Sequence, residues 1–122
     1  MVNSSVLLAR NAQKYPQQEA IVCQDKRVTY SELNHFVNKF ASSLRENSIQ
    51  AGDKVILFMP NVLEFAISYF AVQRIGAIVV PISAKLTLKE VTYIVDHSNA
   101  SAIITHELLF NTVNELEKPI LK

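Results

Sequence analysis

The feature that most constrains this chain is an alternation of short apolar runs with helix-length amphipathic segments. The runs at residues 54–59, 77–82 and 101–105 predict strands. Single strands separated by helices of crossover length form parallel, right-handed βαβ units. The run at 54–59 ends at Pro60 and is typical of a strand buried on both faces. The alternation therefore predicts an α/β fold with a mostly parallel sheet and flanking helices.

The expected helix starts follow a common pattern, in which a capping side chain precedes a glutamate by three residues. Three pairs have this spacing: Thr29 with Glu32, Asn61 with Glu64, and Thr87 with Glu90. After the first pair, apolar residues recur at three- and four-residue intervals, which predicts one buried helical face. This stripe consists of Leu33, Phe36, Val37, Phe40, Ala41 and Leu44. Further helices are expected at residues 5–14, at 61–75 and from 107 to about 119, with short strands at 19–23 and 27–29.

The chain has only two glycines, Gly52 and Gly76, and each precedes an apolar run. Gly76 is expected to be the left-handed residue that ends the helix at 61–75. Phosphate-binding loops need several glycines close together, so that backbone N–H groups can approach the ligand. Neither a Walker A motif nor a G-x-G-x-x-G fingerprint occurs. The sequence therefore disfavours an independent Rossmann-type nucleotide binder.

Composition excludes several other classes of protein. Twelve Lys and Arg residues against eleven Asp and Glu give a net charge of +1, and the charges are scattered. There is therefore no basic surface for nucleic acid. The N-terminus has no signal-peptide pattern, and no apolar stretch is long enough to be a transmembrane segment. A single cysteine suits a reducing compartment, so a cytoplasmic protein of one domain is expected.

Few side chains are candidates for chemistry. His35, His97 and His106 do not have metal-ligand spacing, and structural or surface roles are favoured for all three. His106 is the most interesting because it follows a strand. Cys23 lies in an apolar run, which favours a packed thiol over a nucleophile. Lys85 follows the strand at 77–82, where a phosphate could be met, although a solvated lysine is the favoured interpretation.

Several segments, in order, resemble signatures of the adenylate-forming (AMP-binding) superfamily. Residues 29–33 (TYSEL) match a Tyr-x-Glu-Leu segment that opens a helix. Residues 52–55 (GDKV) match a Gly-Asp pair before an apolar strand that ends near Asn61. Residues 74–81 (RIGAIVVP) match a helix end that runs into Gly-Ala-x-x-x-Pro. The chain thus resembles the N-terminal part of that superfamily over about residues 5–110, and acyl-CoA synthetases or ligases most of all.

Two positions depart from the family pattern. Family members commonly carry glycine near Ser48, before the Gly-Asp pair, and we expect Asn47 to supply the left-handed cap instead. After the second signature, Ser83 and Ala84 replace a common Asn-Pro pair. The second change reshapes the loop that carries Lys85.

The resemblance implies a function for a longer parent enzyme. That enzyme would use ATP and Mg²⁺ to convert a small carboxylic acid, such as a fatty acid, to an acyl-adenylate. It would then transfer the acyl group to coenzyme A (CoA). The family's phosphate loop, adenine and magnesium motif, ribose-binding aspartate and catalytic lysine all come later in the chain. Residues 1–122 are therefore expected to be a partial N-terminal domain without catalytic or metal-binding residues. Lys85 matches a loop position where some members place a basic side chain near the CoA phosphates.

This resemblance predicts that the chain is inactive alone, and that its partner is the remainder of the parent enzyme. The alternative is a free-standing, non-catalytic α/β interaction module derived from the same family. The reading frame beyond Lys122 would separate the two. The expected helix at 61–75 is apolar on most sides, and open sheet edges drive association. We therefore also expect the isolated chain to self-associate.

Overall fold

The computed structural model describes residues 4–23, 25–106, 109 and 113–115. The elements are α1 (Ser4–Lys14), β1 (Glu19–Cys23), β2 (Lys26–Thr29), α2 (Tyr30–Glu46), β3 (Lys54–Phe58), α3 (Leu63–Arg74), β4 (Ile78–Ile82), α4 (Leu88–Ser98) and β5 (Ala102–Thr105). The expected order of helices and strands is confirmed from the first helix to the strand near residue 105. The helix expected from 107 to 119 falls mostly outside the described residues.

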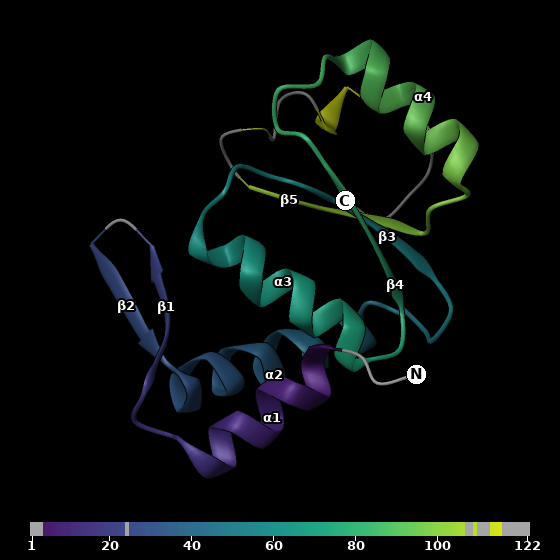
Figure 1. Cartoon of the computed structure of the whole chain (residues 1–122). Coiled ribbons are helices and arrows are strands. Elements are labelled where there is room, and N and C mark those ends of the chain that lie inside the picture. Colours follow the sequence, from purple (N-terminus) through teal and green to yellow (C-terminus); the bar gives the residue numbers. More distant parts are fainter. Residues whose placement is uncertain (1–3, 24, 107–108, 110–112, 116–122) are drawn as a thin grey trace.

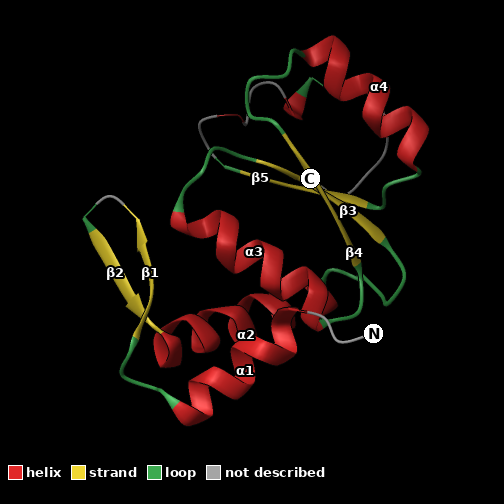
Figure 2. Ribbon diagram, in the orientation of Figure 1, coloured by secondary structure: helices red, strands yellow, loops and turns green. Residues whose placement is uncertain are grey.

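The main sheet has the order β4-β3-β5, and both pairings are parallel. Val55 of β3 lies between Val79 of β4 and Ala102 of β5 in the register. Helices α3 and α4 connect the successive strands, as the spacing of the apolar runs predicts. β1 and β2 form a separate antiparallel ribbon beside the helices, as Figure 2 shows. The predicted α/β architecture with a mostly parallel sheet is confirmed.

Helices cover both faces of the sheet (Figure 1). On one face, Val55 belongs to a core cluster formed with α1, α2 and α3. On the other face, Ile56 and Phe58 pack with Val91 and Val95 of α4. Successive side chains of a strand point to opposite faces, so a strand covered on both sides must be apolar throughout. β3 is accordingly buried from Val55 to Phe58, and the prediction for this strand is confirmed.

Two of the three predicted capping boxes are present. Thr29 and Thr87 each accept the backbone N–H of the glutamate three residues later, and each glutamate accepts the threonine's N–H in return. The hydrogen bonds from Thr87 lower the pKa of Glu90, because they favour its ionised carboxylate.

The box expected at Asn61 is wrong. The N-cap of α3 is Val62, which makes no side-chain cap hydrogen bond. The N–H of Val62 donates to the carbonyl of Pro60 at 2.8 Å, and this turn delays the helix by one residue. Asn61 therefore precedes the cap position, from which a side chain reaches the free N–H groups of the first turn.

The left-handed residue after α2 is Ser48, with φ of +68°, and not Asn47, whose φ is −91°. Asn47 is the C-cap, and its side-chain amide donates to the carbonyl of Ser43 at 2.8 Å. The N–H of Ile49 donates to the carbonyl of Leu44, which is typical of a Schellman ending. In that ending the left-handed residue comes one position after the cap. The expectation for Asn47 is therefore corrected by one residue.

We predict that Ser48→Gly stabilises the protein by about 0.5–1 kcal/mol. A non-glycine residue in the left-handed region costs roughly 1–2 kcal/mol, and the extra backbone entropy of glycine in the unfolded chain offsets part of the gain. Urea unfolding measures the change as a higher midpoint. The matched control is Ser42→Gly, in the interior of α2, which should lower the midpoint. A lower midpoint for Ser48→Gly would contradict the assignment.

The apolar stripe of α2 is wider than the surface that the described residues bury. Leu33, Val37, Ala41 and Leu44 are buried as expected. Phe40 is half-buried and packs against the core cluster, but Phe36 is 40% exposed, so the predicted burial is wrong for Phe36.

α3 is apolar on most sides because it has neighbours on several of them. It packs against α2, α1, β3 and β4. Ala71 and Val72 are buried, while Leu63 and Ile67 near its start are half-buried. The helix is therefore largely enclosed, and its uncovered part lies near its first turn. Self-association of the isolated chain stays a prediction.

Candidate functional site: a cleft at the carboxyl ends of the strands

A cleft of about 820 Å³ opens where β3 and β5 end, beside α2 and α3. Its lining is mainly apolar and comes from α2, α3, β5 and the residue that follows β3. The apolar lining residues are Phe36, Phe40, Met59, Leu63, Ile67 and Ile104. Ligands of open α/β sheets gather at the carboxyl ends of the strands, so this cleft is the candidate functional site.

A second hollow of about 330 Å³ continues from the cleft along β5. The two share Phe40, Ser43, Ile104 and Thr105 in their linings. The second hollow also reaches Ala102 at the start of β5 and Asn47 at the end of α2. The two hollows therefore form one groove, which we call the β5 groove, between α2 and the length of β5.

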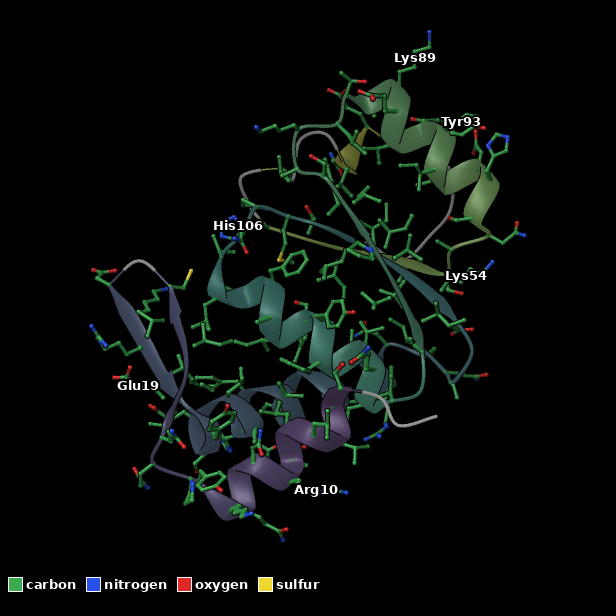
Figure 3. All side chains as sticks on the ribbon, viewed as in Figure 1. Arg10, Glu19, Lys54, Lys89, Tyr93 and His106 are labelled. Carbon is green, nitrogen blue, oxygen red and sulfur yellow. The ribbon has the colours of Figure 1, made fainter. Side chains whose placement is uncertain are left out.

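At the wide end of the groove, a side-chain hydrogen bond joins the ends of two strands. The Thr105 hydroxyl donates to the carbonyl of Phe58 at 2.7 Å and joins the ends of β5 and β3. His106 follows directly, is half-buried and lines the cleft. Figure 3 places His106 at the carboxyl-end side of the sheet, away from Lys54 at the start of β3. The expectation that His106 lies at the carboxyl end of a strand is confirmed.

The charges of the residues that line the cleft nearly cancel. Lys39 from α2 and Glu64 from α3 line it, and both are exposed. A site for phosphate groups concentrates positive charge or backbone N–H donors. The described lining does not concentrate positive charge, because the carboxylate of Glu64 accompanies Lys39. On charge, the cleft suits an apolar occupant better than a nucleotide.

Lys85 lies in the loop between β4 and α4 and is exposed. It is not among the residues that line the cleft, so the structure does not bring Lys85 and His106 into one site. The backbone N–H of Lys85 donates to the hydroxyl of Ser83 at 3.2 Å, and this contact shapes the loop. Its side chain is available to solvent at the carboxyl end of β4.

The other candidate residues have structural or surface positions. His35 is exposed on α2. His97 is exposed on α4, where its ring stacks on Tyr93 at 4.0 Å between centroids. Cys23 is half-buried, with Sγ 3.9 Å from the carbonyl oxygen of Asn61. Among the described residues, no three His, Cys, Asp or Glu side chains lie together as a metal site would require.

The two glycines meet at the opposite end of the sheet from the cleft. The N–H of Gly52 donates to the carbonyl of Gly76 at 3.0 Å. The next residues of each loop lead into β3 and β4, so this hydrogen bond joins the amino ends of two neighbouring strands. Gly76 has φ of +81°, as expected for the residue after a helix cap. The glycines therefore hold the scaffold together at a distance from the cleft.

Sequence reasoning missed one polar cluster, centred on Arg74 at the end of α3. Its Nε donates to Ser5 Oγ at 2.6 Å, and its Nη2 donates to the Ser5 carbonyl at 3.0 Å. Its Nη1 donates to Asn38 Oδ1 at 2.9 Å. Burial lowers the pKa of Arg74, although an arginine remains charged at neutral pH. Because Ser5 and Asn38 are distant in sequence, no local pattern could reveal this link between α1, α2 and α3.

Comparisons with known proteins give a consistent picture. A family model described as "AMP-binding enzyme" matches residues 8–121. Over 106 residues, the chain is 34% identical to the long-chain-fatty-acid–CoA ligase FadD13 of Mycobacterium tuberculosis. Over 112 residues, it is 32% identical to the crotonobetaine/carnitine–CoA ligase of Escherichia coli. The matches cover 85% and 88% of this chain but only 21% and 22% of these relatives. The chain thus spans about a fifth of their length.

Solved structures show the same relationship. The inhibitor-bound N-terminal domain of FACL13 from Mycobacterium tuberculosis superposes with a TM-score of 0.89 and 30% identity. This match covers 98% of the present chain and 31% of that domain. The anthranilate CoA ligase AuaEII superposes with a TM-score of 0.91, and at 24% identity this likeness concerns the fold alone. The described helices of this chain include none long and apolar enough to cross a membrane.

Proposed function

Because the chain belongs to the AMP-binding enzyme family, we propose that it forms the N-terminal portion of an ATP-dependent carboxylate–CoA ligase. The observations that carry this proposal are the likeness of nearly the whole chain to the N-terminal domain of FACL13 and its 34% identity to the long-chain-fatty-acid–CoA ligase FadD13. The complete enzyme would convert a small carboxylic acid to an acyl-adenylate and then to a CoA thioester. A fatty acid is the leading substrate class, and the cytoplasm is the proposed location.

In this proposal the chain supplies scaffold and the rest of the enzyme supplies the chemistry. The described residues include no cluster of glycines for phosphate and no group of metal ligands. ATP and Mg²⁺ would therefore be held by later segments of the ligase. What these residues contribute is the central strand β3, buried on both faces, and the two parallel strands beside it. The chain by itself is accordingly proposed to be inactive.

A chimera tests the proposal. The chain replaces the aligned part of the mycobacterial ligase FadD13, and carboxylate-dependent ATP–pyrophosphate exchange and thioester formation are measured. We expect activity from the chimera and none from the chain alone. Exchange catalysed by the isolated chain would contradict the proposal, as would a folded chimera that lacks both activities. The alternative, a free-standing interaction module, would be favoured by a native stop codon after Lys122.

We further propose that Lys85 contacts a phosphate of CoA in the complete ligase. Its exposed side chain and its place at the carboxyl end of β4 support this role. An exposed lysine–phosphate contact is worth about 1 kcal/mol, so Lys85→Ala in the chimera should raise the KM for CoA roughly fivefold. ATP–pyrophosphate exchange should not change, because it precedes the use of CoA. The control is Lys89→Ala, on the exposed side of α4. An unchanged KM for CoA would exclude the contact.

A further inference from the structure

The backbone around Lys85 is held by two hydrogen bonds to a single residue, Ser83. The N–H of Lys85 donates to the Ser83 hydroxyl at 3.2 Å, and the N–H of Leu86 donates to the Ser83 carbonyl at 3.2 Å. The second bond closes a β-turn over residues 83–86. Neither Ala84 nor Lys85 is among the described residues with positive φ, as in the common type I turn. Serine is favoured at the first position of such a turn, because its hydroxyl is an additional acceptor.

Both ends of this turn are anchored in the fold. Ile82 ends β4, and it packs with Leu86 against the core cluster on the α4 side of the sheet. After the turn, the N–H of Thr87 donates at 3.0 Å to a carboxylate oxygen of the capping box of α4. Lys85 is exposed between these anchors, and the Ser83 hydroxyl holds its N–H. The turn therefore presents Lys85 from a fixed backbone.

A fixed backbone matters for Lys85 because its side chain is long and exposed. A lysine side chain has several rotatable bonds, and ordering it on a ligand costs conformational entropy. If the backbone moves as well, the ammonium group is spread over a larger volume and meets a phosphate less often. The Ser83 hydroxyl removes this second freedom, because its oxygen accepts the N–H of Lys85. Only the rotamers of the lysine then remain to be ordered.

We propose that Ser83 is a positioning residue for CoA, which acts through Lys85. Its hydroxyl fixes the turn from which the lysine side chain meets a CoA phosphate. This inference rests on the proposed function, because it requires the contact between Lys85 and CoA. The asparagine that is common at this position in the family can accept the same hydrogen bond. Ser83 therefore keeps an acceptor at this position despite its departure from the family pattern.

Amide exchange in the chain itself tests the turn without any catalysis. NMR measurement of exchange with water resolves the N–H groups of the loop individually. Ser83→Ala should make the N–H of Lys85 exchange about threefold faster or more, because that N–H loses its acceptor, and Ser83→Asn should restore slow exchange. The N–H of Thr87, whose acceptor is Glu90, is the matched control and should not change. An unchanged rate at Lys85 in Ser83→Ala would overturn the proposal.

CoA kinetics in the chimeric ligase test the consequence. Ser83→Ala should raise the KM for CoA about two- to threefold, less than Lys85→Ala, because the freed lysine still meets the phosphate part of the time. Ser83→Asn should restore the KM, and ATP–pyrophosphate exchange should be the same in all these variants. Thr92→Ala is the matched control, because it also removes an exposed hydroxyl that bonds a backbone group, the carbonyl of Leu88 at 2.7 Å. It should leave the KM for CoA unchanged.

A double-mutant cycle separates positioning from direct contact. Because Ser83 acts through the lysine, Ser83→Ala should cause no further rise in the KM for CoA when Lys85→Ala is already present. A further rise would mean that the Ser83 hydroxyl touches CoA itself, and would overturn the proposal.

The failure of this proposal is distinguishable from the failure of the proposed function. A raised KM for CoA in Lys85→Ala, with none in Ser83→Ala, would overturn the positioning alone. An unchanged KM in Lys85→Ala would remove the CoA contact and this inference together, but not the ligase activity. A folded but inactive chimera would contradict the ligase activity. The dissociation constants of the same variants for CoA, measured by calorimetry, would then decide the positioning by the same ratios.

Discussion

Gly76→Ala should destabilise the protein by about 2–4 kcal/mol, more than the same substitution at Gly52. Gly76 has φ of +81°, where an alanine costs roughly 1–2 kcal/mol. A Cβ at this position would lie 3.2 Å from Cβ of Ala51. Ala51 has no rotamer that could relieve the contact, so the backbone of one loop must move, at a cost typical of overpacking. Thermal unfolding would show the loss as a lower melting temperature.

Gly52 provides the matched control for this prediction. Its φ is +87°, but a Cβ there would meet nothing within 4 Å. Gly52→Ala should therefore lose only the conformational part, about 1–2 kcal/mol. Ala51→Gly, introduced together with Gly76→Ala, should recover the steric part, as a double-mutant cycle would reveal. If both glycine variants lost the same stability, and Ala51→Gly restored none of it in Gly76→Ala, the contact between the two loops would contribute nothing to stability.

Arg74→Ala should destabilise the protein by about 1.5–3 kcal/mol. A single hydrogen bond to a charged group contributes roughly this much. Arg74 makes three across α1, α2 and α3, but it is only partly buried, so solvent weakens each of them. The substitution also leaves the buried Ser5 side chain without this donor. Because Ser5 and Asn38 belong to two different helices, the loss should loosen the packing of all three. Urea unfolding measures the change in free energy.

Arg27→Ala is the control, because Arg27 also makes a polar contact, an ion pair with a carboxylate, but at an exposed position. Its Nη1 lies 3.1 Å from Glu19 Oε2, but the two side chains are 65% and 47% exposed. Exposed ion pairs contribute about 0–1 kcal/mol, so this variant should be nearly neutral. If Arg27→Ala lowered the free energy of unfolding more than Arg74→Ala, the explanation for Arg74 would be refuted. That explanation is partial burial together with hydrogen bonds to the uncharged oxygens of Ser5 and Asn38.

Local patterns determined the elements because their causes lie within a few residues. The threonine and glutamate of each confirmed box are three residues apart, so one helix turn brings them together. Asn61 had the same spacing and failed, because the turn at Pro60 moved the helix start. Ser48 took the left-handed position expected for Asn47, because the Schellman ending places that residue one position after the cap.

The candidate site could be predicted from the sequence only in part. His106 could be placed at a strand's carboxyl end from sequence, because it follows an apolar run. The groove could not be placed, since its walls come from α2, α3, β5 and the residue after β3. Periodicity even predicted that Phe36, which is 40% exposed, would be buried. A stripe shows that a helix has an apolar face, but it does not show whether this part of the chain covers it.

By itself, the sequence determined the order of helices and strands, the parallel sheet, two capping boxes and the resemblance to adenylate-forming enzymes. Each of these depends on spacing along the chain. Only the tertiary structure decided that Gly52 and Gly76 bond to each other, that Arg74 joins three helices, and that β5 and α2 enclose an open groove. These contacts join residues distant in sequence, and they exist only once the sheet and its helices have packed.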